Sequence, residues 1–250
     1  MKKLLAMALA MAVAASAWAG DVYVAAAASL TDVMKAVQAK YEQAHPAVKL
    51  TVVYGATGML RTQVLQGAPC DVFIGADRWF GGAESNAAEV VRLDTVRVVA
   101  CNTLVAVAGR EAPPAGGALA DWLGGAKKIG VGNPASVPAG RYAKKLLESE
   151  KLWDANTPKY VFGTNVREVL LWLRQGVVQV GFVYGSDLVA ANDAGLKTLA
   201  TYETPGGGAI ELAGGVAKNA KNAAEALAFL DALKAPEAQA ALRDLGFTVK

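Results

Sequence analysis

Apolar runs alternate along the chain with segments whose apolar residues recur every three or four positions. The run from Val22 to Ala28 predicts a buried strand, and the apolar positions from Leu30 to Tyr41 predict one face of a helix that stops near Pro46. The same order of strand, small residues and helix returns over residues 48–67 and leads into a third strand at 70–77. Strands that alternate with helices indicate βαβ units and a parallel sheet, so the fold class is α/β.

The alternation stops and restarts twice before the end of the sequence. The interruptions lie around residues 96–117 and 205–215, where proline and glycine residues gather. Two α/β lobes joined by two or more crossing strands account for them: lobe 1 from residues 20–100 and 206–250, and lobe 2 from residues 101–205. Further strands are predicted at 96–107, 128–132, 160–162, 177–184 and 209–216, and further helices at 118–123, 141–152, 165–176, 220–233 and 236–245.

Residues 1–19 have the three features of a secretory signal peptide. Two basic residues, Lys2 and Lys3, precede an apolar run from Leu4 to Trp18, and small residues occupy the A-x-A positions before Gly20. The run is shorter than the about 20 apolar residues that a transmembrane helix needs. We therefore expect a cleaved signal peptide over residues 1–19 and export to the periplasm.

Charge and residue counts exclude several classes of function. Removal of Lys2 and Lys3 takes the basic residues from 25 to 23 against 22 acidic ones, without the basic excess of a nucleic-acid-binding protein. The two cysteines, Cys70 and Cys101, could pair in the periplasm or stay buried as free thiols. Together with the single histidine, His45, they cannot form a conventional zinc site, and we expect neither a cofactor nor a free metal ion.

Four segments of similar composition each open a predicted helix. They contain Ser29, Thr57, residues 136–139 and residues 165–166, and Tyr184 ends a further predicted strand. Each segment alone is most simply a helix N-cap. The pair Asn165–Glu168 resembles a capping box, and the pair Ser29–Asp32 resembles one imperfectly. Residues 185–187, which end at Asp187, open a further predicted short helix. Together, at the carboxyl ends of parallel strands, the four segments would direct several positive helix ends into one cleft. A cleft with donors and no obligatory acceptor favours an oxyanion that is fully deprotonated at neutral pH.

A secreted serine hydrolase is the alternative from another class of function. Ser29, Ser136 and Ser186 are candidate nucleophiles, but the base would have to be a lysine or His45. His45 precedes a proline at a predicted helix end and lacks an evident orienting partner. The sequence also contains no G-x-S-x-G, Walker or G-x-G-x-x-G motif. We therefore expect a binding protein, not an enzyme, with no catalytic residue.

Six groups of short motifs follow one another from about Val22 to Lys250. They are Ala26–Thr31, Gly67–Pro69 with Asp71–Asp77, Gly132–Pro134 with Val137–Gly140, Asn165–Arg167, Val183–Asp187 and Gly246–Lys250. In order and spacing these motifs resemble the periplasmic molybdate-binding proteins, which are the substrate-binding components of molybdate ABC transporters. No single motif carries the resemblance, but their common order does.

The resemblance implies a two-lobed type II periplasmic binding fold, in which each lobe is a mostly parallel sheet flanked by helices and the ligand cleft lies between the lobes. It implies that hydroxyl and backbone N–H donors hold the oxyanion without cationic side chains, so that Arg167 would not be a ligand. The implied partner is an inner-membrane ABC permease, and we expect a monomer. Carried over by position, the residues that bind molybdate or tungstate are Ser29, Thr57, Ala139, Val166 and Tyr184.

Thr57 departs from the family pattern, which usually has serine at this position within a serine-rich run. Threonine keeps the hydroxyl donor but adds a methyl group and restricts χ1. Because pocket size should separate molybdate and tungstate from the smaller sulfate, the same fold with another tetrahedral oxyanion, such as sulfate or chromate, stays open as the alternative.

Overall fold

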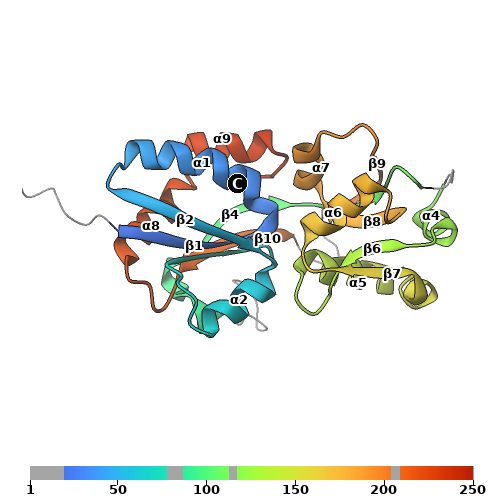
Figure 1. Cartoon of the computed structure of the whole chain (residues 1–250), viewed down its shortest axis with the longest axis horizontal. Helices are drawn as coiled ribbons and strands as arrows, with labels where there is room; N and C mark the ends of the chain where they lie inside the picture. Colours follow the sequence, from blue (N-terminus) through green and yellow to red (C-terminus); the bar gives the residue numbers. More distant parts are fainter. Residues whose placement is uncertain (1–19, 78–86, 113–116, 204–208, 250) are drawn as a thin grey trace, which may run out of the picture.

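The computed structural model describes residues 20–77, 87–112, 117–203 and 209–249. These residues form two five-stranded sheets with flanking helices, and the two units lie side by side along the longest axis of the molecule (Figure 1). The predicted two-lobed α/β fold is therefore confirmed. The predicted signal peptide and the predicted lobe boundary at 205–206 lie outside the described residues. In the described part of the chain, every helix is too short or too polar to cross a membrane.

The sheet of lobe 1 combines three parallel strands with an antiparallel pair. Its order is β2-β1-β3-β10-β4, and β10 runs antiparallel to both of its neighbours. Ala27 is the register partner of Gly55, so β1 and β2 end at the same level. The strands are β1 (Gly20–Ala27), β2 (Val48–Gly55), β3 (Val72–Gly75), β4 (Arg97–Asn102) and β10 (Ile210–Val216), and the helices are α1 (Thr31–Ala44), α2 (Thr57–Leu65), α3 (Ala87–Val90), α8 (Ala223–Ala232) and α9 (Pro236–Asp244).

The sheet of lobe 2 repeats this arrangement. Its order is β7-β6-β8-β5-β9, with β7, β6 and β8 parallel and β5 antiparallel to both β8 and β9. Gly132 is the register partner of Gly163, so β6 and β7 also end level with each other. The strands are β5 (Leu104–Ala108), β6 (Ile129–Gly132), β7 (Tyr160–Gly163), β8 (Val180–Tyr184) and β9 (Lys197–Tyr202), and the helices are α4 (Leu119–Gly125), α5 (Pro138–Ser149), α6 (Val166–Gln175) and α7 (Gly185–Ala191).

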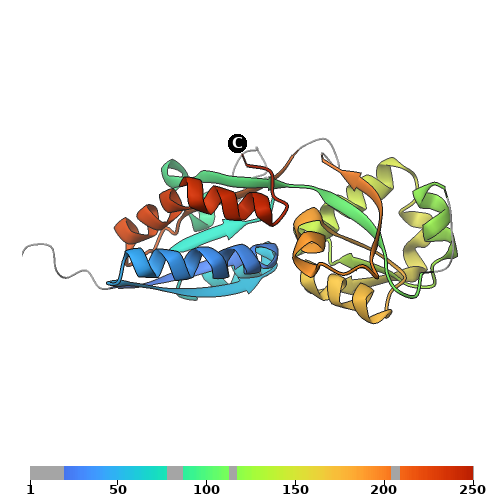
Figure 2. The ribbon, with the colours of Figure 1, turned by 90° about the horizontal axis from the view of Figure 1, so that it is seen from above.

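The chain passes between the two sheets at two points. Only Thr103 separates β4 from β5, and the second passage lies between β9 and β10. The C-terminal helices then return to lobe 1, where α9 packs beside α1 (Figures 1 and 2). Cys101 and Asn102, placed in lobe 2 by the predicted boundary, belong to a strand of the first sheet. The residue limits of the lobes otherwise stay a prediction.

The strand predicted over residues 96–107 is divided at Thr103 into β4 and β5, which belong to different sheets. Other elements also differ from their predictions. The helix expected from Arg141 begins three residues earlier, at Pro138, because proline is well suited to the first helical position, where its missing N–H would have no partner. The strand β9 was not predicted, since its partly exposed residues (Lys197–Tyr202) lack a clear apolar alternation. Its backbone is nevertheless paired along β5, at the edge of the lobe 2 sheet.

Candidate functional site

A small cavity lies where the carboxyl ends of strands from both sheets meet the first turns of their helices. These turns lie together because neighbouring strands end at the same level, β1 with β2 in lobe 1 and β6 with β7 in lobe 2. Four of the five predicted ligand residues line this cavity, and the fifth, Ala139, follows the lining residue Pro138. The lining consists of Ala27, Ala28, Ser29, Gly55, Ala56, Thr57, Ala76, Val137, Pro138, Asn165, Val166 and Tyr184.

Ser29 presents a buried hydroxyl group to this cavity. It lies in a short 3-10 helix, η1 (Ala28–Leu30), that connects β1 to α1. The predicted capping box between Ser29 and Asp32 is wrong, because α1 begins at Thr31 without a side-chain cap. Ser29 is 2% exposed, and its Oγ has no hydrogen-bond partner among the described residues. A buried polar group left in this state costs about 1–3 kcal/mol, which a bound acceptor would recover.

Thr57 supplies a second hydroxyl at the start of α2. The predicted N-cap role of Thr57 is wrong, because Ala56 occupies that position and Thr57 is the first helical residue. The Thr57 side chain instead accepts a hydrogen bond from the backbone N–H of Ala76, at 3.1 Å. Since the hydroxyl oxygen is the acceptor in this contact, its own hydrogen is available to donate.

Tyr184 ends β8, as predicted, and brings a phenolic hydroxyl from lobe 2 to the cavity. It is 2% exposed, and its hydroxyl donates to the carbonyl oxygen of Ala76 in lobe 1 at 3.3 Å. Burial raises the pKa of Tyr184 well above its usual value, and the nearby Tyr142 and the carboxylates Asp77 and Asp187 act in the same direction. The phenol therefore stays protonated, and it can donate at any physiological pH.

The first turns of α5 and α6 contribute backbone donors. Pro138 opens α5 and has no N–H, so Ala139 carries the first N–H of that helix, and Ala139 is almost fully buried. At α6 the Asn165 side chain caps the helix by accepting from the backbone N–H of Glu168 at 3.0 Å. Val166 follows as the first helical residue, and its N–H has no partner within the helix. The predicted Asn165–Glu168 capping box is half present, since the Glu168 carboxylate accepts from Thr164.

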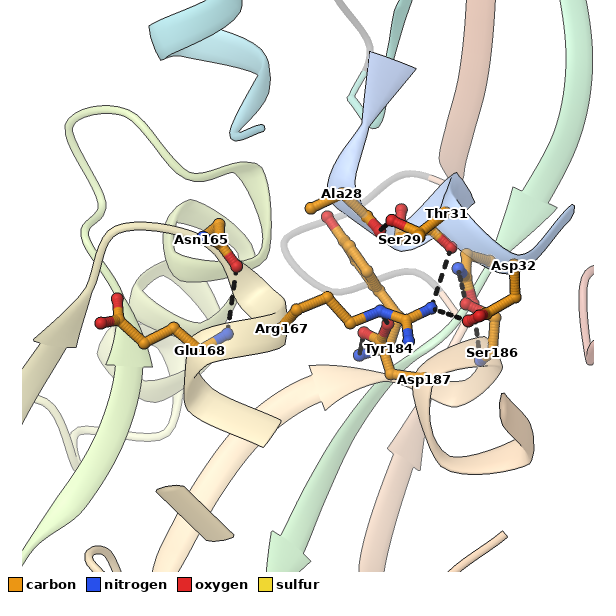
Figure 3. Close-up of polar contacts among 11 residues, drawn as sticks. Ala28, Ser29, Thr31, Asp32, Asn165, Arg167, Glu168, Tyr184, Ser186 and Asp187 are labelled. Carbon is orange, nitrogen blue, oxygen red and sulfur yellow. Dashed lines mark hydrogen bonds and ion pairs between the residues drawn. The ribbon is translucent and has the colours of Figure 1, made fainter. Parts of the chain in front are cut away.

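Arg167 lies beside the cavity but does not line it (Figure 3). Its Nε lies 2.7 Å from Oδ1 of Asp187, and a terminal nitrogen lies 2.8 Å from Oδ2 of Asp32 in lobe 1. The same terminal nitrogen donates to the carbonyl oxygen of Ser29 at 3.4 Å. Complete burial raises the pKa of Asp187 to about 6, although Arg167 acts in the opposite direction. The guanidinium is thus engaged by two carboxylates, and its exclusion from the ligand set stays a prediction.

Sequence reasoning missed this group of charges around Arg167. Asp32 was interpreted only as part of a helix cap, and Asp187 only as the start of a short helix. The available signal was weak, because each residue is also a common one in the first turn of a helix. The structure shows instead that Asp187 accepts from the backbone N–H of Tyr184 at 3.0 Å while it contacts Arg167. It therefore connects a cavity residue to the neighbouring ion pairs.

The chemistry of the cavity is that of a neutral set of donors. Hydroxyl groups and helix N-termini face it, and the described lining residues include no lysine, arginine, aspartate or glutamate. Helix N-termini carry a partial positive charge and unpaired N–H groups, which together favour an anion. A carboxylate in the lining would repel such a ligand. The arrangement can therefore hold an oxyanion without a full positive charge in direct contact.

The arrangement gives no support to hydrolysis. His45, the candidate base, is exposed at the end of α1, and its ring lies tilted against Tyr41 at 4.3 Å between ring centroids. The 14-residue helix α1 spans roughly 20 Å, which separates His45 from the Ser29 end of the helix. Cys70 and Cys101 are buried and are not joined to each other, so the alternative of a disulfide is not realised. Among the described residues no group of three or more potential ligand side chains could hold a metal ion.

Comparisons with known proteins agree with this architecture. The molybdate-binding protein ModA of Escherichia coli (strain K12) is 33% identical over 251 residues, covering 97% of this chain and 95% of that protein. ModA of Haemophilus influenzae is 28% identical over the full length of both chains. Among solved structures, the periplasmic molybdate-binding protein of Azotobacter vinelandii superposes with a TM-score of 0.75 at 19% identity, covering 92% of this chain and 99% of that one.

The resemblance seen in the motifs is thus confirmed at the level of whole chains. A family model described as bacterial extracellular solute-binding protein matches residues 22–248, which includes both lobes and every residue that lines the cavity. The chain therefore belongs to the family of bacterial extracellular solute-binding proteins.

Proposed function

We propose that this chain binds molybdate and tungstate in the periplasm and delivers them to the permease of an ABC importer. Ser29 and Thr57 donate through their hydroxyl groups, and Ala139 and Val166 donate through backbone N–H groups. Tyr184 donates its phenolic hydrogen after this hydrogen turns from the Ala76 carbonyl oxygen to the anion. The relatives named as molybdate-binding proteins support the ligand. Membership of a solute-binding family supports a transport role without catalysis.

The unpartnered hydroxyl of Ser29 is the observation that carries the proposal. It is buried, it lies in the lining of a cavity between two lobes, and it has no hydrogen-bond acceptor among the described residues. Thr57 also retains a hydrogen to donate, because its oxygen already accepts from Ala76. A bound oxyanion would provide the acceptors that these groups lack, at a position where several helix N-termini meet.

The choice among oxyanions follows from protonation and size. Phosphate keeps a proton at neutral pH and benefits from an acceptor in its site, whereas molybdate, tungstate and sulfate are fully deprotonated. The described lining includes no carboxylate that could accept this proton, and it therefore disfavours phosphate. Sulfate is smaller than molybdate, and the extra methyl group of Thr57 narrows the site compared with serine. Sulfate is accordingly the alternative ligand, and Thr57→Ser is the variant that examines the influence of that methyl group.

Calorimetric titration with molybdate, tungstate, sulfate and phosphate tests the proposal. We expect molybdate and tungstate to bind much more tightly than sulfate, and phosphate to bind weakest. Sulfate binding as tight as molybdate binding would contradict the proposal. An anion held between the two lobes should also favour their closure, because it contacts both lobes only in the closed state. Small-angle scattering should therefore report a smaller radius of gyration with molybdate than without it.

The Ser29→Ala variant tests directly whether the unpartnered Ser29 hydroxyl binds the anion. A hydrogen bond to a charged group contributes about 1.5–3 kcal/mol, so we expect molybdate affinity to fall about 10- to 150-fold. The melting temperature without anion should not fall, because the lost hydroxyl has no partner in the described structure. Ser149→Ala is the matched control, since that hydroxyl bonds only the Leu146 carbonyl oxygen within α5. Equal affinity of Ser29→Ala and wild type would refute the assigned site.

A further inference from the structure

Two carboxylates from different parts of the chain hold Arg167 in place. Asp187, in the same lobe, is completely buried and lies 2.7 Å from Nε of Arg167. Asp32 belongs to α1 in lobe 1 and lies 2.8 Å from a terminal nitrogen of the same guanidinium. Arg167 thus extends from the first turn of α6 to the first turn of α1 (Figure 3). Its ion pair with Asp32 joins one lobe to the other.

The position of this ion pair links it to the two sides of the cavity. Arg167 directly follows Val166, and its terminal nitrogen also donates to the carbonyl oxygen of Ser29 at 3.4 Å. Ser29 and Val166 are lining residues on opposite lobes, whereas Arg167 and Asp32 are not in the lining. The guanidinium therefore holds together the two corners that would supply donors to the anion, from a position outside the lining.

We infer that the Asp32–Arg167 ion pair is a closure clamp that slows release of the bound anion. The inference rests on the proposed function, because it assigns a role to residues around that site. When the lobes separate, Asp32 moves away from Arg167, while Asp187 remains with it in lobe 2. The buried Asp187 keeps the guanidinium extended and oriented, so little side-chain entropy is lost when Asp32 returns. The ion pair consequently favours the closed state and not the open one.

Asp32→Asn is the informative variant. The Asp32 side chain is 38% exposed, so its replacement leaves no buried charge unpaired. Replacement of Arg167 alone would leave Asp187 buried without its partner and would lower stability for that reason. Partly exposed ion pairs contribute modestly, and we expect the dissociation rate of molybdate to rise about threefold in Asp32→Asn, with little change in the association rate. Glu237→Gln, in the exposed first turn of α9, makes the same chemical change away from the lobe interface and serves as the control.

The experiment follows the release of radiolabelled molybdate after addition of excess unlabelled molybdate. It compares wild type, Asp32→Asn, Arg167→Gln, the double variant and Glu237→Gln. We expect Asp32→Asn to accelerate release in the wild-type background but not in the Arg167→Gln background. Melting temperatures without anion should be alike for wild type, Asp32→Asn and Glu237→Gln. A purely structural role for Asp32 would instead change the melting temperature and would act equally in both backgrounds.

Two results would overturn the inference. One is an unchanged release rate in Asp32→Asn, and the other is an acceleration of equal size in the presence and absence of Arg167. Because Asp32 does not line the cavity, the accelerating factor should be the same when tungstate replaces molybdate. Failure of the wild-type chain to retain either anion would refute the proposed function and the clamp together. It would appear before any variant is compared, so the two failures are distinguishable.

Discussion

Gly58 provides a sharp test of lobe closure, because a single methyl group added there would meet the opposite lobe. It is the second residue of α2, and its N–H donates to the carbonyl oxygen of Ser136 in lobe 2 at 3.1 Å. A Cβ at this position would lie 2.7 Å from that oxygen and 3.0 Å from the Ser136 Cα. Both atoms belong to the backbone, which cannot rotate away as a flexible side chain would.

The expected size of the effect follows from these distances. An ordinary contact begins at 3.4 Å, so Gly58→Ala requires a local separation of the lobes by roughly 0.7 Å. Forced contacts of this kind cost about 1–3 kcal/mol, which corresponds to an affinity for molybdate about 5- to 150-fold weaker. The same substitution replaces glycine by alanine in the first turn of a helix, which stabilises the helix by up to about 1 kcal/mol. The anion-free protein should therefore unfold at a higher temperature while it binds more weakly.

Calorimetric titration and thermal unfolding of Gly58→Ala measure the two effects separately. Gly124→Ala is the matched control, because Gly124 also lies in a helix and a Cβ there would meet nothing within 4 Å. The control should gain stability and keep the affinity of the wild type. Wild-type affinity in Gly58→Ala would refute the reasoning, since it would mean that the anion-bound state does not contain the Gly58–Ser136 contact.

Two further predictions concern titratable groups. Burial raises the pKa of Cys70 to about 12, so we expect iodoacetamide at pH 8 to modify Cys70 in the denatured protein but not in the folded protein. Mass spectrometry locates the label, and rapid labelling of Cys70 under native conditions would contradict its burial. Burial raises the pKa of Asp187 to about 6, above its usual 3.8, so proton uptake between pH 7 and pH 4 stabilises the fold and this contribution is lost as pH rises through 6. The unfolding free energy of wild type minus that of Asp187→Asn should therefore increase by at most about 3 kcal/mol over that interval, and a decrease would show the opposite shift.

The sequence predicted the elements that bury a continuous apolar face. The alternation of strands with helices was sufficient to predict the α/β class and the division into two lobes. A helix or strand that buries one face repeats its apolar residues with a fixed period, and this period can be read from the sequence. It failed at β9, whose residues are mostly half exposed at a sheet edge. It also misplaced the start of α5, since a proline can either precede a helix or open it.

The candidate site was predictable where it depends on local sequence, and not where it depends on contacts between lobes. Ser29, Thr57, Val166 and Tyr184 were placed at strand and helix ends, and the structure brings them to one cavity. Their proposed hydrogen bonds to an anion remain predictions. Arg167 and Ser29 are in contact although they lie 138 positions apart in the sequence. Apolar periodicity within a single sequence predicts local elements and does not reveal contacts between such distant residues.

The connection between the sheets has a consequence for the order in which the chain can fold. Asn102 and Ile210 are register partners in lobe 1, and Leu104 and Tyr202 are register partners in lobe 2. All strands of the second sheet thus come from one uninterrupted stretch, inserted at the tip of what would otherwise be a β-hairpin. During synthesis the second sheet can complete its pairing once β9 has emerged, whereas β3 and β4 must wait for β10, the strand that separates them. The lobe that begins the chain is therefore the last to be finished.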